Sequence, residues 1–435
     1  MNDYKKDISD FIDQLTAKYG GPIPRFAHNL KEFDGKVLYS GFYWDKREVQ
    51  AILENILFNP WSVNGAKVAE FERAFSRKIG LAESVMTNSG SSANLAMMAG
   101  LKRRFGWNDG DEILVSCCSF PTTVSVIPQN QLKAVFLDVN FEDLNSDLDK
   151  FSSLVTHKTR AIFFAPTLGN PGNFGRLVEL CKKYNIMLIL DNCDALGTTY
   201  LGKQLTEYAV SASCSFFASH HASAIQAGMI SSNDKELMKI CGSLVRWSRN
   251  CFCSGVANLL PNGTCKKRFS NWLETQPDVI IDDKYYFTER GFNFQPLEFQ
   301  GAVGLVQLDK LDEIHSKRKN HHDKIKTLFQ KYIPDVEFLK VYDGVEPSWF
   351  GVGLICKDYT QKRKLVQFLE DNKIQTRNFF SGNILEHPGY KDLGDWKLYP
   401  RSSETLRRVF FIGCSPSLTE RHIEYIEEIL KKWED

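Results

Sequence analysis

The stretch IMLILDNCDALGTTY, residues 186–200, places the apolar run IMLIL immediately before Asp191 and a turn of small and polar residues. A short, nearly continuous apolar run indicates a strand that is buried on both faces, as in parallel sheets. A carboxylate at the end of such a strand is costly unless it has a partner. The stretch therefore predicts an α/β fold with a buried acidic group at one edge of its sheet.

The same pattern repeats on both sides of this stretch. Helical candidates at 91–106 and 176–185 alternate with apolar runs that we expect to be strands. These runs are EILVSC (112–117), AVFLDV (134–139), RAIFFAP (160–166), IMLILD (186–191), SCSFFAS (213–219) and GMISSN (228–233). Strands separated by helices predict a mostly parallel sheet with helices on both faces.

The rest of the chain predicts a short N-terminal helix and a smaller C-terminal α+β part. Residues 236–290 are rich in Cys, Asn, Gly and basic residues, and we expect an insertion with little regular structure there. Further helices are expected near 297–311, 311–332, 360–371 and 418–433, with strands near 350–356 and 408–412. We therefore expect an N-terminal helical segment (1–60), a large domain (61–310) and a small domain (311–435).

Composition indicates an ordinary globular protein. The chain has 435 residues, 43% hydrophobic and 25% charged residues, and a formal net charge of +1. A nearly neutral chain gives no reason to expect a nucleic-acid partner. The first 20 residues contain acids, unlike a signal peptide, and no run of about 18 uncharged apolar residues predicts a membrane span. We expect a cytoplasmic protein.

Eleven cysteines are many for such a chain, and their spacing is uneven. In a reducing compartment cysteines are free, catalytic or bound to metal rather than paired. Those in apolar contexts are expected to be small buried core residues. They are Cys181, Cys214, Cys241, Cys356 and Cys414.

Two segments, one leading into a predicted helix and one following a predicted strand, could bind a ligand at the sheet edge where open α/β sheets bind them. In TNSGSSANLAMM (87–98), Gly90, Ser91 and Ser92 at the start of a helix suit a phosphate, although a serine cap is the ordinary alternative. In CSFPTTV (118–124), Phe120 could lie against a flat ligand or pack in the core.

Two more segments carry ionisable groups to the same edge. Asp191 could pair with a protonated heteroaromatic nitrogen or cap the next helix. His220 and His221 could bind metal, but neighbours on an extended segment point to opposite sides, so one imidazole could face a ligand while the other faces protein. Either histidine could also be purely structural.

Together these segments resemble the sugar aminotransferase and dehydratase family of fold-type I pyridoxal-phosphate enzymes. In that family a Gly-Ser/Thr turn, an aromatic residue, an aspartate and a segment S-F-x-x-x-K appear in this order. Here the last segment is Ser215-Phe216-Phe217-Ala218-Ser219-His220, so that His220 replaces the lysine that would hold the cofactor covalently. The resemblance implies pyridoxamine 5′-phosphate bound non-covalently by a sugar 3-dehydratase, which removes the C3 hydroxyl of a nucleotide-linked 4-keto-6-deoxyhexose.

The resemblance also implies residue roles. Asp191 would pair with the pyridinium nitrogen and Phe120 would stack on the ring. Gly90, Ser91 and Ser215 would hold the phosphate, and Asn293, in GFNFQPLEFQGAVGLVQL (291–308), would reach a phosphate across a homodimer interface. His220 would take a proton from the cofactor's C4′ carbon, because imidazole titrates near neutral pH. His221 would orient substrate or support the structure.

Four other cysteines resemble those of the iron–sulfur members of the family, the CDP-4-keto-6-deoxyglucose 3-dehydrases. Their spacing C-x57-C-x-C, followed by a fourth cysteine, is matched by Cys193, Cys251, Cys253 and Cys265. Four thiolates suit a [2Fe–2S] cluster. The resemblance implies electrons from an NAD(P)H-dependent flavin or iron–sulfur reductase, and a role in making 3,6-dideoxyhexoses for lipopolysaccharide O-antigen.

The chain departs from the family pattern at Gln226-Ala227 and Gln295-Pro296, on the implied substrate side. The resemblance implies CDP-4-keto-6-deoxyglucose as the first choice of substrate, and these departures leave the nucleotide open between cytidine, thymidine and guanosine diphosphates. Two alternatives also stay open. One is a cluster-free sugar dehydratase-deaminase of the colitose type with incidental cysteines. The other is a non-catalytic paralogue with a structural zinc on the same four cysteines.

Overall fold

The computed structural model describes residues 3–19, 33, 35–59, 61–250, 266 and 268–434. Its centre is a seven-stranded sheet in the order β1-β9-β8-β5-β4-β2-β3. The strands are β1 (Glu83–Thr87), β2 (Glu112–Ser116), β3 (Lys133–Leu137), β4 (Thr159–Phe164), β5 (Met187–Asp191), β8 (Ser211–Ser215) and β9 (Gly228–Ser232). Neighbouring strands are parallel except that β9 runs antiparallel to β1 and β8. The predicted mostly parallel sheet is confirmed.

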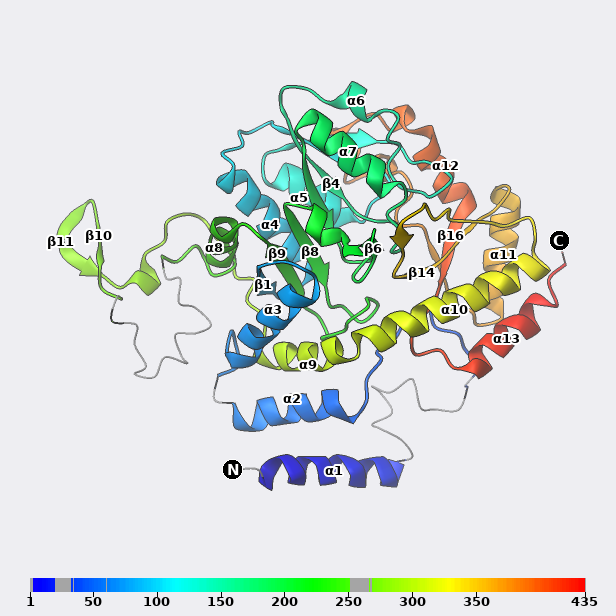
Figure 1. Cartoon of the computed structure of the whole chain (residues 1–435), viewed down its shortest axis with the longest axis horizontal. Helices are drawn as coiled ribbons and strands as arrows, with labels where there is room; N and C mark the ends of the chain where they lie inside the picture. The colour runs from blue at the N-terminus through cyan, green and yellow to red at the C-terminus, as the bar shows by residue number, and fades with distance from the viewer. Residues whose placement is uncertain are drawn as a thin grey trace.

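Helices cover both faces of this sheet because side chains alternate along each strand. On β2, Ile113 and Val115 pack with α4 (Gly90–Arg104), α5 (Pro121–Gln129) and α8 (Lys235–Leu244). Leu114, between them, packs instead with α6 (Phe151–Leu154) and α7 (Phe174–Tyr184). Figure 1 shows the helices around the sheet. Burial on both faces explains why the strands are continuously apolar.

Four helices pack one against the next, outward from β1. Contacts join α3 (Ala66–Lys78) to β1 and to α9 (Glu298–Asp309), α9 to α2 (Lys46–Phe58), and α2 to α1 (Asp3–Tyr19). Figure 1 shows α2 and α1 in blue below the sheet. The predicted N-terminal helix is therefore present.

The 22-residue helix α10 (Leu311–Tyr332) leads from α9 to a second sheet, which is antiparallel and four-stranded (Figure 1). Its strands, in order, are β12 (Glu337–Phe338), β14 (Gly351–Ile355), β16 (Val409–Gly413) and β15 (Thr376–Asn378). The helices of this part are α11 (Tyr359–Asp371), α12 (Pro400–Arg408) and α13 (Glu420–Leu430). A small third sheet connects the two parts through β13 (Val345–Glu346), β6 (Thr199–Tyr200) and β7 (Lys203–Gln204).

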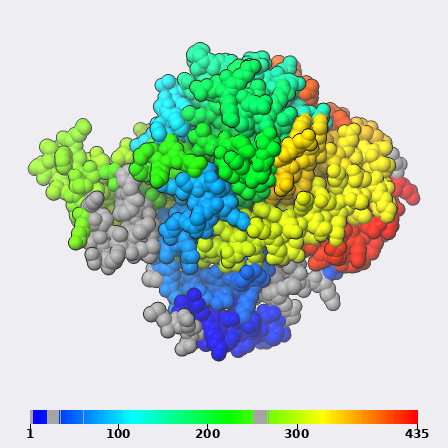
Figure 2. Space-filling model, viewed as in Figure 1, coloured from blue at the N-terminus to red at the C-terminus, as the bar shows by residue number. Residues whose placement is uncertain are grey.

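The expectation of little regular structure over 236–290 is wrong at both ends of that range. Residues 235–244 form α8, whose Leu237 and Cys241 pack on the large sheet. Further on, β10 (Asn271–Leu273) and β11 (Gln276–Ile281) form a hairpin that projects from the molecule at the left of Figures 1 and 2. No helix among the described residues is long and apolar enough to cross a membrane.

Candidate active site

The segments that follow β1, β2, β5 and β8 surround a cavity of about 650 Å³. The cavity is also lined from the C-terminal sheet, by Arg377 of β15 and Phe411 of β16. Predicted site residues from four separate segments line it together: Gly90, Ser91, Phe120, Asp191, Ser215 and His220. The fold therefore brings these six residues into one site.

Asp191 ends β5, and its carboxylate is buried beside the cavity. Its Oδ2 accepts hydrogen bonds from Asn94 Nδ2 at 2.8 Å and Thr123 Oγ1 at 2.7 Å, and its Oδ1 accepts the Cys193 N–H at 3.3 Å. All of these partners, in the part of the chain that the structure describes, are neutral. A buried carboxylate without a cation, on the wall of a cavity, fits a protonated ring nitrogen.

The start of α4 is pressed closely against β8 and β9. A Cβ on Gly90 would lie 2.6 Å from Ser215 Cβ, and one on Gly228 would lie 2.2 Å from the Ser89 carbonyl oxygen. Ser89 caps the helix by accepting the Ser92 N–H at 3.1 Å. The first N–H groups of a helix lack partners within it and favour anions, so this junction fits a phosphate group.

Phe120 stands at the N-terminus of α5, just before Pro121. Its side chain is 53% exposed although it lines the cavity. An aromatic ring in this position offers apolar area to a flat ligand. Of the two interpretations open for Phe120, packing in the core is therefore wrong.

His220 and His221 have opposite surroundings. His220 lines the cavity, and its Nδ1 lies 3.3 Å from Asp194 Oδ1, without the alignment of a hydrogen bond. His221 is buried behind the cavity, with its Nε2 3.0 Å from the Ser348 carbonyl oxygen. Burial, reinforced by the nearby Arg318 guanidinium, holds the pKa of His221 well below its ordinary value. Only His220 is placed to act on a ligand.

The buried Arg318 fixes the backbone that carries His220. Its Nη2 donates to the carbonyl oxygens of Ser219 at 3.1 Å and His220 at 3.2 Å. Its Nη1 donates to the Phe350 carbonyl oxygen at 3.1 Å. The guanidinium on α10 thus joins the histidine loop to the segment that enters β14, which lines the same cavity.

Cys193 lines this cavity two residues after Asp191, with a partly exposed side chain. The other three cysteines of the expected cluster, Cys251, Cys253 and Cys265, lie outside the described residues. Among the residues that are described, no group of three His, Cys, Asp or Glu side chains is positioned to hold a metal ion. The five cysteines expected to be core residues are all buried, as predicted: Cys181, Cys214, Cys241, Cys356 and Cys414.

Of the residues predicted to bind the cofactor, all of which the structure describes, only Asn293 does not line the cavity within a single chain. It is exposed, and its Oδ1 accepts a hydrogen bond from Gln295 Nε2 at 3.2 Å. Of the two departures from the family pattern, Gln226-Ala227 lines the cavity, just before β9 begins. Gln295-Pro296 does not line it within one chain.

Sequence reasoning missed several residues that complete the site. Asn94 lies four residues after Gly90, on the same face of α4, and helical periodicity could have identified it. Thr123 and Asp194 lie inside stretches that the sequence had singled out, CSFPTTV and LILDNCDALGTTY. Tyr39 and Arg377 come from distant segments with no local signal.

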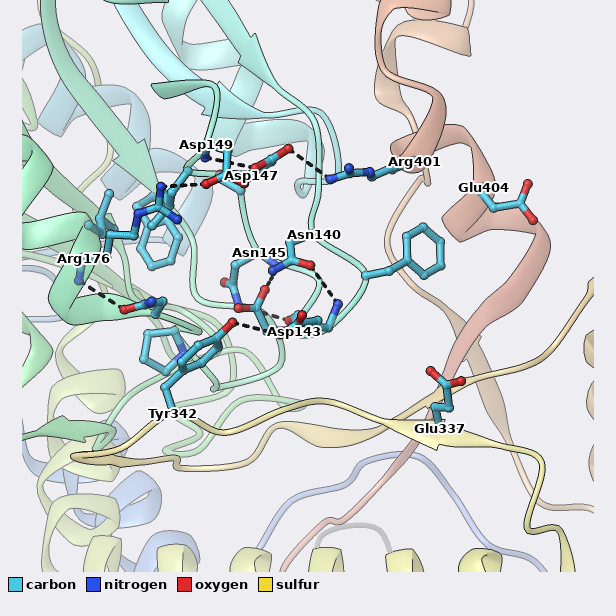
Figure 3. Close-up of a pocket in the computed structure, with 18 of the residues that line it drawn as sticks. Asn140, Asp143, Asn145, Asp147, Asp149, Arg176, Glu337, Tyr342, Arg401 and Glu404 are labelled. Atoms are coloured by element: carbon cyan, nitrogen blue, oxygen red, sulfur yellow. Dashed lines mark hydrogen bonds and ion pairs between the residues drawn. The ribbon is translucent and has the colours of Figure 1, made fainter. Parts of the chain in front are cut away.

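A second cavity, of about 740 Å³, lies between the large region and the C-terminal part (Figure 3). Four of its charged side chains form two ion pairs with each other. Arg401 Nη1 lies 3.0 Å from Asp147 Oδ2, and Arg176 Nη2 lies 2.6 Å from Asp149 Oδ1. The Arg401–Asp147 pair joins the C-terminal part to the large region, so this cavity lies at a contact zone between the two parts.

Comparison with known proteins identifies relatives along nearly the whole chain. Residues 44–431 match the model of the DegT/DnrJ/EryC1/StrS aminotransferase family. The lipopolysaccharide biosynthesis protein RfbH of Salmonella typhimurium is 32% identical, covering 98% of this chain and 97% of that protein. The dTDP-4-dehydro-2,6-dideoxy-D-glucose 3-dehydratase of Saccharopolyspora spinosa is 34% identical, covering 85% and 80%.

Solved structures agree with the fold. The structure of the E. coli GDP-4-keto-6-deoxy-D-mannose-3-dehydratase with bound hydrated PLP superposes with a TM-score of 0.77 at 28% sequence identity. The match covers 91% of this chain and 99% of that one. The fold-type I arrangement expected from the sequence is thereby confirmed.

Proposed function

Because the chain belongs to the DegT/DnrJ/EryC1/StrS aminotransferase family, we propose that it is a 3-dehydratase of a nucleotide-linked 4-keto-6-deoxyhexose that uses pyridoxamine 5′-phosphate. One observation carries the proposal. The segment after β8, where the family's lysine is expected, places His220 in the same cavity as the buried Asp191. A plain aminotransferase would need an amine at this place. Two named relatives are 3-dehydratases, which supports the same reaction here.

Six residues would hold the cofactor. Asp191 would pair with its ring nitrogen, Phe120 would lie on its ring, and Gly90, Ser91 and Ser215 would bind its phosphate, with Asn293 supplied by a second subunit. The bound cofactor supplies a primary amine for the sugar's C4 ketone and a ring that accepts electrons. Asn94 and Thr123 would keep the Asp191 carboxylate oriented through the hydrogen bonds described above.

His220 would move the proton at the cofactor's C4′ carbon and assist departure of the C3 hydroxyl. The Asp194 carboxylate near Nδ1 favours the tautomer with its proton on Nδ1, which leaves Nε2 free as the base. Arg318, by holding the His220 carbonyl oxygen, fixes the loop from which the imidazole projects. A positioned base of this kind contributes about 10²- to 10⁴-fold to a rate.

We infer the nucleotide of the substrate from the substrates named for the relatives. Those with a named nucleotide act on dTDP- and GDP-linked sugars, so we place these ahead of the CDP-linked sugar that the cysteine pattern suggested. Gln226 and Ala227 line the cavity in this chain and would contribute to the choice of sugar. A panel of the three nucleotide ketosugars decides between them.

We further propose that Cys193, Cys251, Cys253 and Cys265 bind a [2Fe–2S] cluster that receives electrons from a separate reductase. The place of Cys193 on the cavity wall supports this, because a cluster there would lie near the cofactor. The alternative that the resemblance leaves open is a cluster-free dehydratase-deaminase with incidental cysteines. Iron, zinc and acid-labile sulfide, measured on anaerobically purified protein, separate the cluster, the cluster-free enzyme and the structural zinc.

The test of the main proposal is an absorbance spectrum of anaerobic protein titrated with pyridoxamine phosphate, followed by turnover of dTDP-, GDP- and CDP-linked 4-keto-6-deoxyhexoses. We expect saturable cofactor binding and loss of the C3 hydroxyl, detected by mass spectrometry, from at least one sugar. Release of ammonia without added reductant would indicate the cluster-free reaction. Amino transfer to C4 with the hydroxyl retained would refute the proposal.

A further inference from the structure

The cavity carries one fixed cation whose role the proposed chemistry leaves unassigned. Among the described residues that line the cavity, Arg377 is the only Lys or Arg. Its side chain is exposed, and its hydrogen bond, from Nη1 at 2.7 Å, goes to the Thr376 carbonyl oxygen rather than to a carboxylate. A guanidinium with most of its donors unused, beside a ligand cavity, is placed to bind an anion.

The guanidinium rests on an aromatic ring. The Arg377 Cζ lies 3.9 Å from the centroid of the Tyr39 ring. Stacking on an aromatic face holds the plane of a guanidinium while its edge stays available for hydrogen bonds. The orientation of Arg377 is therefore restricted before any ligand arrives.

The segment that carries Tyr39 is itself fastened to the C-terminal part. Val37 pairs in parallel with the residues before β15, because its N–H donates to the Lys373 carbonyl oxygen and its carbonyl oxygen accepts the Gln375 N–H, both at 2.9 Å. A Cβ on Gly413 of β16 would lie 1.7 Å from the Tyr39 carbonyl oxygen, so glycine is required for this close approach. Tyr39 is thus a built support for Arg377.

We propose that Arg377, supported by Tyr39, binds the diphosphate of the nucleotide sugar. The inference rests on the proposed function for its substrate class. A planar guanidinium matches two phosphate oxygens at once, and a diphosphate needs such a partner in a cavity that also holds the Asp194 carboxylate. The proposed site for the cofactor's phosphate is a different one, at the start of α4 beside β8 of the seven-stranded sheet. Arg377 is therefore a substrate-binding residue contributed by the C-terminal part.

The experiment measures binding to protein saturated with pyridoxamine phosphate, so that the phosphate cradle is filled. Calorimetry compares dTDP, GDP and CDP with the corresponding nucleosides. We expect the wild-type chain to bind at least one diphosphate more tightly than its nucleoside. Arg377→Gln should lower the affinity for that diphosphate by about 10- to 100-fold, which is the range for a hydrogen bond to a charged group. The affinity for the nucleoside should stay unchanged.

Matched variants separate this role from a structural one. Arg407→Gln removes an exposed arginine that also lies over a tyrosine ring, 5.3 Å from the Tyr359 centroid, but away from the cavity, and it should change nothing. Arg377→Lys should retain part of the affinity, because it keeps the charge and loses the planar pair of donors. Tyr39→Phe should behave as wild type, whereas Tyr39→Leu should weaken the diphosphate.

Failure of the inference and failure of the proposed function give different results. Equal affinity of the wild-type chain and Arg377→Gln for every diphosphate, or no preference of the wild-type chain for diphosphates, overturns the Arg377 site. Selective loss of diphosphate binding in Arg377→Gln supports the site even if no ketosugar is dehydrated, which would reject the dehydratase alone. Where turnover is seen, Arg377→Gln should raise KM and leave kcat nearly unchanged.

Discussion

His220 and His221 show how one residue step decides between a catalytic and a structural imidazole. The two side chains leave the turn after β8 on different sides, so the cavity receives His220 and the protein interior receives His221. His221 Nε2 is bonded to a carbonyl oxygen, and burial lowers its pKa well below the ordinary value, so its ring stays neutral near pH 7. Only His220 keeps the freedom to exchange a proton with a ligand.

Replacement of His220 tests this division directly. His220→Asn should lower C3 dehydration by about 10²- to 10⁴-fold and leave pyridoxamine phosphate binding within a few-fold, because it removes the base and keeps the loop. His220→Lys should attach pyridoxal phosphate covalently, seen as a borohydride-reducible mass increase, and should gain amino transfer. The exposed His157→Asn serves as the control. Full dehydration by His220→Asn would remove the histidine from the mechanism.

A second residue-scale prediction concerns Asp143, which lines the contact-zone cavity of Figure 3 and is 3% exposed. Burial raises its pKa to about 6, above the value of about 4 expected in the unfolded chain. The folded state therefore keeps a proton that the unfolded state releases, and this group's contribution to stability falls as pH rises from 4 to 6.

Asp143→Asn cannot titrate and still accepts the Asn145 N–H, so it should be more stable than the wild-type chain above pH 6. The gain should be about 2–3 kcal/mol at pH 7 and should shrink toward pH 4. Unfolding midpoints measured across this range check it, with the exposed Asp343→Asn as control. A gain that is the same at both ends of the range would contradict the assigned pKa.

Site residues whose surroundings come from neighbouring positions in the chain could be predicted from the sequence. Residues whose surroundings come from distant segments could not. Asp191 could be identified because an apolar run forces it to a buried strand end. Tyr39 and Arg377 could not, since their contact joins segments 338 positions apart and leaves no periodicity in either. Asn293 stays a prediction, because its expected contact lies in another subunit.

At the scale of elements, the fit of α4 against β8 shapes the phosphate cradle, and Gly90 is the residue that permits it. Gly90→Ala would place a methyl group 2.6 Å from Ser215 Cβ, which forces the helix start away from the strand. Overpacking of this kind typically costs about 1–3 kcal/mol. We expect weaker pyridoxamine phosphate binding together with a lower unfolding midpoint, measured by titration and by thermal unfolding.

Gly389→Ala is the control for this substitution, because no atom lies within 4 Å of the Cβ it would add. A Gly90→Ala chain that binds the cofactor like the wild type would place the phosphate elsewhere.

The direction of β9 shows a limit of predicting strands from the sequence. Six apolar runs predicted six strands correctly, but they could not show that β9 runs antiparallel, which is what brings Gln226 and Ala227 to the cavity.

The prediction of little regular structure over 236–290 was wrong because the elements there have weak sequence patterns. The short strands β10 and β11 lie outside the core, so they lack the apolar alternation that marks a half-buried strand. The helix α8 is only ten residues long and stands at the edge of a polar stretch. The strands β10 and β11 leave a weak signal because they lie outside the core, whereas α8 packs on the core but is short and adjoins a polar stretch.

At the scale of the whole molecule, we propose the division into residues 1–60, 61–310 and 311–435. The long helix α10 begins at Leu311, and the sheet β12-β14-β16-β15 follows it with its own covering helices. The active-site cavity takes residues from all three parts, since Tyr39, His220 and Arg377 belong to one part each. Any relative movement of the parts would therefore change the distance between the base and the proposed diphosphate site.

The hairpin β10–β11 connects the fold to the proposed homodimer. An isolated two-stranded hairpin is at best marginally stable in water, yet this one presents the directly paired Trp272 and Ile280 at 55% and 64% exposure. Asn293, which we propose reaches a second subunit, follows this hairpin closely in the chain. Both observations favour a second copy of this chain as the partner that covers the hairpin.

Ile280→Lys should therefore shift the protein from dimer to monomer, as measured by sedimentation or light scattering. The affinity for pyridoxamine phosphate should fall as well, because the partner's Asn293 would be lost with the dimer. Leu398→Lys is the matched control, since Leu398 is 69% exposed and lies away from the hairpin on the C-terminal part. A monomeric wild-type chain, or an Ile280→Lys chain that remains dimeric with unchanged cofactor affinity, would show that the hairpin does not join two subunits. Loss of the dimer with full cofactor affinity would instead keep the interface and remove Asn293 from the phosphate site.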